Sequence, residues 1–159
     1  MENINIALKT TQGIFNYRVG AIIIDSGKIL MVKNSGQEFY YSIGGRVKFG
    51  ESTKEAVLRE AFEETNINFE IDKLAFIHEN FFIWEKDNEQ IHEIAFFYIL
   101  KSNKYLKDFN QKTFKEEYGE VTLHWLPIKN LKNYEIYPVF FKDELLNPVN
   151  NVKHYITRD

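Results

Sequence analysis

A glycine and a series of charged residues in the first half of the chain have the types and the spacing that a metal site requires. In order, they are Gly45, Glu51, the pair Arg59-Glu60 and the pair Glu63-Glu64. Clustered carboxylates supply the hard oxygen ligands that divalent cations prefer, and a bound cation can hold a phosphate chain. This segment therefore predicts a metal site directed at a phosphate-containing ligand.

The residues after Glu51 predict a helix that positions these side chains. Ser52 can act as the N-cap, and Glu55 follows three residues later, which makes a capping box. The next residues include no glycine or proline and are mostly good helix formers. Helical periodicity places Val57, Leu58, Ala61, Phe62 and Thr65 on a packing side, and Glu60, Glu63 and Glu64 on the other.

An ordinary solvated helix face is the alternative interpretation of these acids. Like charges three or four residues apart on a helix destabilise it by about 0.2–0.5 kcal/mol per pair. Glu60 and Glu64 have no basic residue at those distances along the helix to offset the repulsion. Because a bound cation would relieve it, we favour the metal site.

The segment from Gly45 to Ile67 closely resembles the Nudix box, G-x5-E-x7-R-E-U-x-E-E-x-G-U, where U is aliphatic. Every charged position of the box is present. Asn66 replaces the glycine near the helix end, and asparagine is the second-best residue for a left-handed C-cap. Ala61 fills an aliphatic position, and Ile43 stands where relatives often carry proline. None of these departures removes a ligand.

The resemblance implies roles for the charged residues. The implied ligands of Mg²⁺, or of Mn²⁺, are the side chains of Glu60, Glu63 and Glu64 and the backbone carbonyl of Gly45. Arg59 would pair with Glu51 or Glu63 and orient that carboxylate. A plain i,i+4 pair of Arg59 with Glu55 is the simpler alternative, and both can hold.

Bound Mg²⁺ would assist hydrolysis of a diphosphate bridge by neutralising its oxygens and by lowering the pKa of a water molecule. We favour Glu63 as the general base, because some members of the family use a glutamate of the box. Others use a distant loop, where Glu116 and Glu117 are candidates here. His92 and Glu93 are a third choice, although a histidine on a strand is more often bonded to a neighbour.

Two arginines and several aromatic residues are candidates for substrate binding. Arg18 and Arg46 can contact phosphate through their forked donors. Tyr41 can stack on a base. The other aromatic candidates, which at alternating strand positions are more often core, are Phe39, Tyr40, Phe81, Phe82 and Trp84.

The substrate class follows by exclusion. The chain lacks the family's markers for ADP-ribose, dinucleoside polyphosphate and coenzyme A substrates, which leaves a (deoxy)nucleoside triphosphate or an oxidised nucleotide. An isopentenyl diphosphate isomerase of similar fold would need a cysteine, and the chain has none. A non-catalytic nucleotide-binding or sensor module is the other alternative, but such modules usually lose acids of the box.

Composition bounds the class of protein. The 159 residues suit one domain, residues 1–159, and 44% of them are hydrophobic, which excludes a disordered chain. The N-terminus does not resemble a signal peptide, and no apolar run is long enough to span a membrane, so we expect a cytoplasmic protein. With a net charge of −3 and no basic block, we expect a nucleotide partner rather than a nucleic-acid polymer, and a homodimer stays open.

Strands dominate the remaining pattern. The expected strands are 17–25, 28–33, 38–43, 69–85, 90–101, 120–126 and 152–157, with a turn at Ser26-Gly27 and a hairpin tip at 86–89. Further helical turns are expected at 112–117 and 128–131, and a final helix at 137–146. These elements predict an α/β (α+β) protein with a mixed sheet, and the resemblance implies an α/β/α sandwich.

Overall fold

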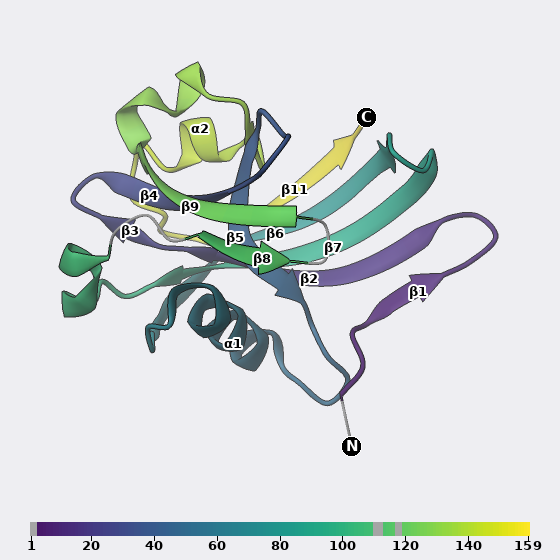
Figure 1. The fold of residues 1–159 in the computed structure, drawn as a ribbon, viewed down its shortest axis with the longest axis horizontal. Coiled ribbons are helices and arrows are strands. Elements are labelled where there is room, and N and C mark those ends of the chain that lie inside the picture. Colours follow the sequence, from purple (N-terminus) through teal and green to yellow (C-terminus); the bar gives the residue numbers. More distant parts are fainter. Residues whose placement is uncertain (1–2, 110–112, 117–118) are drawn as a thin grey trace.

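The computed structural model describes residues 3–109, 113–116 and 119–159, and its centre is a mixed sheet with helices on both faces (Figure 1). The strands are β1 (Ala7–Lys9), β2 (Ile14–Ile22), β3 (Ile24–Asp25), β4 (Lys28–Asn34), β5 (Tyr40–Arg46), β6 (Ile71–Trp84), β7 (Glu89–Leu100), β8 (Thr113–Glu116), β9 (Gly119–Pro127), β10 (Ile136–Tyr137) and β11 (Lys153–Arg158). The helices are α1 (Thr53–Thr65) and α2 (Phe141–Glu144), with 3-10 turns η1 (Lys104–Asp108) and η2 (Ile128–Asn133).

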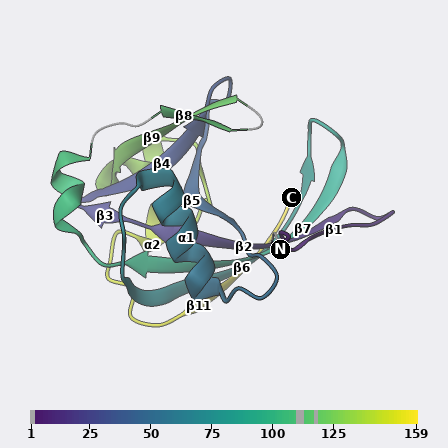
Figure 2. The ribbon, with the colours of Figure 1, turned by 60° about the horizontal axis from the view of Figure 1, so that its bottom comes forward.

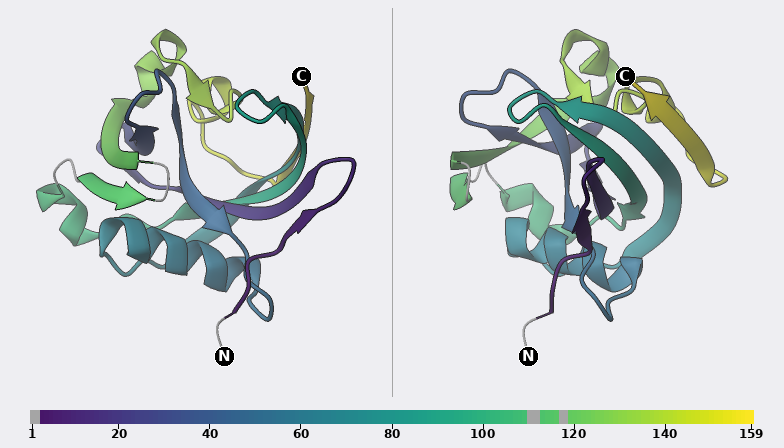
Figure 3. Two further views of the ribbon diagram at one scale, coloured as in Figure 1. Left: turned by 45° about the vertical axis from the view of Figure 1, so that its right-hand side comes forward. Right: turned by 90° about the vertical axis from the view of Figure 1, so that its right-hand side faces the viewer.

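The strand order is β11-β6-β7-β2-β5-β4-β9-β8, with β1, β3 and β10 attached to the sides. Three pairs are parallel, namely β2 with β7, β6 with β11 and β5 with β10, while the others are antiparallel. Strand β5 joins the two halves of the sheet, because its first residues pair with β4 and its last with β2 (Figure 3). The pairing of β5 with β4 ends at Ser42, three residues before the box begins at Gly45.

The two faces of the sheet are covered by different helices. We call them the α1 face and the α2 face after the helix that covers each (Figures 1 and 2). The α1 face packs residues such as Val19, Ile43 and Val57 into one apolar cluster. The α2 face packs Phe76, Phe97 and Phe141 into another. The α/β/α sandwich with a mixed sheet is thus confirmed.

Helix α1 begins with the expected capping box. The Ser52 hydroxyl accepts the Glu55 N–H at 3.2 Å, and the Glu55 carboxylate accepts the Ser52 N–H at 2.7 Å. The expected packing side is partly wrong, because Phe62 is 41% exposed whereas Glu64 is only 7% exposed. The buried positions are Ala56, Val57, Ala61, Glu64 and Thr65. The small alanine side chains let the helix rest close to the sheet, which turns Glu64 inward and Phe62 outward.

Asn66 ends the helix in the left-handed conformation expected of it, with φ 61° and ψ 23°, and its N–H bonds to the carbonyl of Phe62. Replacing it with glycine should leave stability unchanged or slightly higher, because glycine has no Cβ to strain. Asn66→Val should lower the unfolding free energy by about 1 kcal/mol or more, because a β-branched residue resists positive φ. Thermal melting of the two variants checks this, and an unchanged valine variant would contradict it.

Most expected strands are present with shifted ends, including the β6–β7 hairpin and the turn at Ser26-Gly27. The expected strand 17–25 is divided into β2 and β3. The final helix is much shorter than expected, because Tyr137 pairs with β5 and only Phe141–Glu144 is helical. The helical turn at 112–117 is wrong over Thr113–Glu116, which is strand β8 paired with β9; positions 112 and 117 lie outside the described residues.

Candidate active site

Arg59 is the centre of the charged residues of the box. Its guanidinium donates two hydrogen bonds to the Glu51 carboxylate, both 2.8 Å long, and one of 2.7 Å to Glu60. It also donates to the Arg46 carbonyl at 3.0 Å and approaches Glu63 at 3.4 Å. The forked pairing holds Glu51 firmly, and these bonds lower the pKa of Glu51 and raise that of Arg59.

This arrangement answers one open question from the sequence. Arg59 orients Glu51 and also Glu60, the residue next to it, whereas Glu55 uses its carboxylate to cap the helix. Glu60 therefore has a basic partner that a search at helical spacings does not find. The side chains of Glu51 and Glu60 are only 12% and 15% exposed, so the guanidinium compensates two largely buried charges.

Glu60 lies directly against the backbone of Gly45. A Cβ added at Gly45 would come within 2.3 Å of the Glu60 carboxyl carbon, so any larger residue would displace that carboxylate. Burial raises the pKa of Glu60, and the bond from Arg59 opposes this shift. A carboxylate that is already desolvated, next to a backbone carbonyl, suits a small hard cation.

The donor types therefore fit Mg²⁺, with Glu60, Glu63, Glu64 and the Gly45 carbonyl as the residues that would hold it. In the conformation seen here, no three His, Cys, Asp or Glu side chains within residues 3–109, 113–116 and 119–159 are arranged around one point as ligands. Glu60 faces Arg59, and the Glu63 side chain is 52% exposed. Completing the ligand set requires rotation of these glutamate side chains.

The two arginines predicted to contact phosphate, Arg18 and Arg46, lie on the strands beside Gly45. They are register partners on β2 and β5, one residue along from Gly45. The positive charge of Arg18 is close enough to Glu60 to favour a lower pKa of its carboxyl group, against the larger effect of burial. Tyr41 instead packs, half-buried, against the apolar cluster of the α1 face.

The candidates for the general base are separated by the fold. Glu63 lies beside Arg59 in the box, and Glu93 forms an ion pair of 3.8 Å with Arg18. His92 points to the opposite face of β7 from Glu93, where its ring lies between those of Phe15 and Phe81. The side chain of Glu116 and all of residue 117 lie outside the described residues.

One buried polar residue near the site carries no signal in the sequence. Asn16 is 6% exposed, and its Oδ1 atom has no hydrogen-bond partner among the described residues. A single asparagine in a strand belongs to no motif, so only the structure singles it out.

Comparison with known proteins places the chain in a family. Residues 15–143 match the family model of the NUDIX domain. The mutator protein MutT of Bacillus halodurans has a similar structure, with a TM-score of 0.61, 19% identity and coverage of 89% of this chain and 90% of that one. No protein with a curated description matches the sequence.

Two further solved structures resemble the chain. The MutT protein of Methanosarcina mazei Go1 has a TM-score of 0.55 and 22% identity, covering 85% of this chain and 92% of that one. An ADP-ribose pyrophosphatase of Streptococcus suis has a TM-score of 0.55 and 16% identity, with coverage of 88% and 98%. At these identities the structures establish a shared fold, while the domain match covers most of the chain. The chain therefore belongs to the Nudix hydrolase family.

Proposed function

We propose that this protein is a Mg²⁺-dependent hydrolase that cleaves a diphosphate linkage in a nucleoside diphosphate derivative. The observation that carries the proposal is the placement of Glu60 between Arg59 and Gly45. We expect the substrate to be a (deoxy)nucleoside triphosphate or an oxidised nucleotide. Mn²⁺ would serve as an alternative metal, since it accepts the same oxygen ligands.

Each of the site residues would have its own role in the hydrolysis. Mg²⁺, when bound by Glu60, Glu63, Glu64 and the Gly45 carbonyl, would neutralise the phosphate oxygens and acidify water. Arg59 holds Glu51 and keeps Glu60 beside Gly45, so that a rotation of the Glu60 side chain would bring its carboxylate to the metal. Arg18 and Arg46 would bind the phosphate oxygens beside it. Glu63 would then remove the proton from the attacking water.

Several observations support hydrolysis over mere binding. A module without catalysis would have no need of all the acids of the box, yet Glu51, Glu60, Glu63 and Glu64 are all present. The structural relatives include proteins described as MutT and as an ADP-ribose pyrophosphatase.

No helix in the described parts of the chain is long and apolar enough to cross a membrane. The cytoplasmic location and the homodimer stay predictions.

A panel of nucleoside triphosphates, oxidised nucleotides and nucleoside diphosphate sugars tests the proposal. The purified protein should release the nucleoside monophosphate from at least one compound when Mg²⁺ is present and should stop when EDTA is added. Chromatography of the products identifies the bond that is cut. Binding without turnover of every compound would favour the sensor module instead.

A further inference from the structure

A row of polar side chains crosses the α2 face next to Arg18. Strand register places Asn16 beside Glu93, Glu93 beside Asn80, and Asn80 beside Thr157, on β2, β7, β6 and β11 in turn. Side chains two residues apart on a strand share a face, so Asn16 lies on the same face as Arg18. The row therefore starts where the expected phosphate site ends.

The first three members of this row have hydrogen-bonding capacity to offer a ligand. Thr157 is already bonded to His78 at 2.9 Å, but the Oδ1 atom of Asn16 has no partner in the described structure. The Glu93 side chain is 14% exposed, and its 3.8 Å ion pair with Arg18 is too long for a hydrogen bond. Leaving a buried polar group unbonded costs about 1–3 kcal/mol, which a ligand can recover.

The chemistry of the row selects the kind of group that it can bind. The Asn16 carbonyl and the Glu93 carboxylate accept hydrogen bonds, so the ligand must present donors. The negative charge of Glu93 repels phosphate, which excludes a second phosphate site. Two residues along a strand span about 6.6 Å, a separation comparable to that between a 5′-phosphate and the ribose hydroxyls.

We propose that Asn16, Glu93 and Asn80 bind the ribose hydroxyls of the nucleotide, so that the protein prefers ribonucleotides to 2′-deoxyribonucleotides. Acceptance of the 2′-hydroxyl by a carboxylate is a general means of ribose recognition. The inference rests on the proposed function for the place of the phosphates. When Arg18 turns to a phosphate, its loose pair with Glu93 opens at little cost and frees the carboxylate for the sugar.

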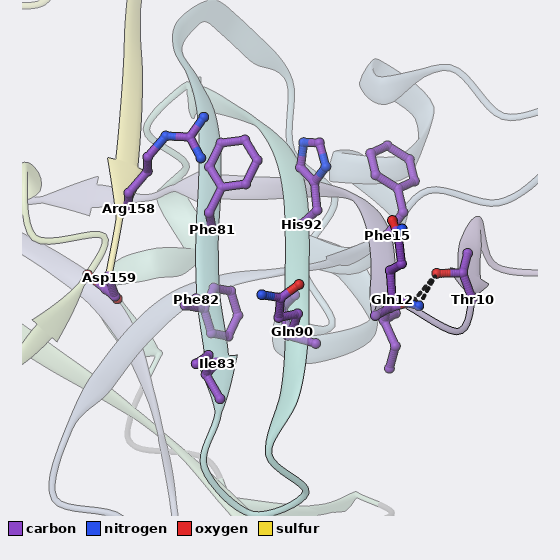
Figure 4. Close-up of a pocket in the computed structure, with 13 residues that line it drawn as sticks. Thr10, Gln12, Phe15, Phe81, Phe82, Ile83, Gln90, His92, Arg158 and Asp159 are labelled. Carbon is purple, nitrogen blue, oxygen red and sulfur yellow. Dashed lines mark hydrogen bonds between the residues drawn. The ribbon is translucent and has the colours of Figure 1, made fainter.

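The next row along the same strands suits the base. Ile14, Ile91 and Phe82 are neighbours in register, and by strand alternation they share a face with Asn16, Glu93 and Asn80. Figure 4 shows a cavity of about 570 Å³ at this end of the sheet, where Phe81 and His92 lie side by side and project from the opposite face. From the box outward the face thus offers a cationic, a polar and an apolar row, the order of phosphate, ribose and base in a nucleotide.

Calorimetric titration with AMP and 2′-deoxy-AMP tests the inference without requiring turnover. The wild-type protein should bind AMP about tenfold or more tightly, because a site built to bond a hydroxyl disfavours the analogue that lacks it. Glu93→Gln and Asn16→Leu should weaken AMP binding and leave deoxy-AMP binding nearly unchanged. The matched control is Glu79→Gln, since Glu79 precedes Asn80 on β6, faces the other way and pairs with His154 at 2.7 Å.

A stability measurement separates ligand binding from a structural role. Asn16→Leu should melt at the same or a higher temperature than the wild type, because it removes an unbonded buried polar group. A marked drop in melting temperature would show that Asn16 serves the fold and would overturn its assignment.

Turnover of ATP and dATP separates this inference from the proposed function. A higher kcat/KM for ATP supports both. Equal kcat/KM values with equal affinities for AMP and deoxy-AMP would overturn the ribose site and leave the hydrolase standing. Tighter binding of AMP without turnover of any nucleotide would support the ribose site and refute the hydrolase.

Discussion

The variant Glu60→Gln should lose both metal affinity and activity, with kcat/KM falling by about 10³-fold. Glu60 is the carboxylate that Arg59 holds at 2.7 Å against Gly45, and an amide there cannot neutralise a cation. Charge stabilisation by a metal is worth several kcal/mol, and each 1.36 kcal/mol is a factor of ten in rate. Steady-state kinetics at increasing Mg²⁺ concentrations measure the two losses together.

Glu63→Gln provides the comparison that separates a ligand from a base. Glu63 lies 3.4 Å from Arg59 and is more exposed than Glu60. If it acts as the base and not as a ligand, its loss should lower kcat by about 10²-fold or more while the metal affinity changes little. A loss of metal affinity as large as that of Glu60→Gln would instead show that Glu63 is a ligand. A larger loss of kcat in Glu116→Gln or Glu117→Gln would move the base to that residue. For Glu93→Gln the loss of kcat must be seen with dATP, which lacks the 2′-hydroxyl that Glu93 is proposed to bind.

Arg59→Met should destabilise the fold as well as the site, by about 3 kcal/mol. Its removal would leave the carboxylates of Glu51 and Glu60, 12% and 15% exposed, without their compensating charge. Arg59→Lys should recover part of this stability but little activity, because an ammonium group cannot form the forked pair with Glu51. Urea unfolding at neutral pH measures the difference.

The exposed Arg158, whose guanidinium lies 4.1 Å from the ring centre of Phe81, provides the control for this experiment. Arg158→Met should cost about 1 kcal/mol or less, the usual value of an exposed cation–π contact. Equal stability of Arg59→Met and Arg158→Met would show that Arg59 does not organise the box.

The box helix and its ends could be predicted because their signals are local. Ser52 and Glu55 form their capping box within one turn, and Asn66 takes up a conformation that few residue types favour. The side of the helix that is buried could not be predicted as well. Which side faces the sheet depends on how closely Ala56 and Ala61 approach it, and that distance is set by another part of the chain.

The tertiary contacts of the charged and aromatic residues could not be predicted from sequence patterns. Glu60 has a cationic partner because the guanidinium of Arg59, the residue next to it, bonds to its carboxylate, and i,i+3 and i,i+4 spacing rules do not consider such a pair. The segment from Tyr137 to Leu146 looks helical, but Phe140 and Phe141 are held by contacts with Phe76 and Phe97 from the sheet. The row that contains Asn16 exists only through strand register between distant segments.

Direct titration of Mn²⁺, followed by its electron paramagnetic resonance signal, tests the central claim that the box carboxylates hold a catalytic metal. The wild-type protein and Glu79→Gln should bind the ion with the same affinity, whereas Glu60→Gln and Glu64→Gln should bind it at least about tenfold more weakly. Equal Mn²⁺ affinity in all four proteins would contradict the account, because the metal would then lie elsewhere or the box would not hold one.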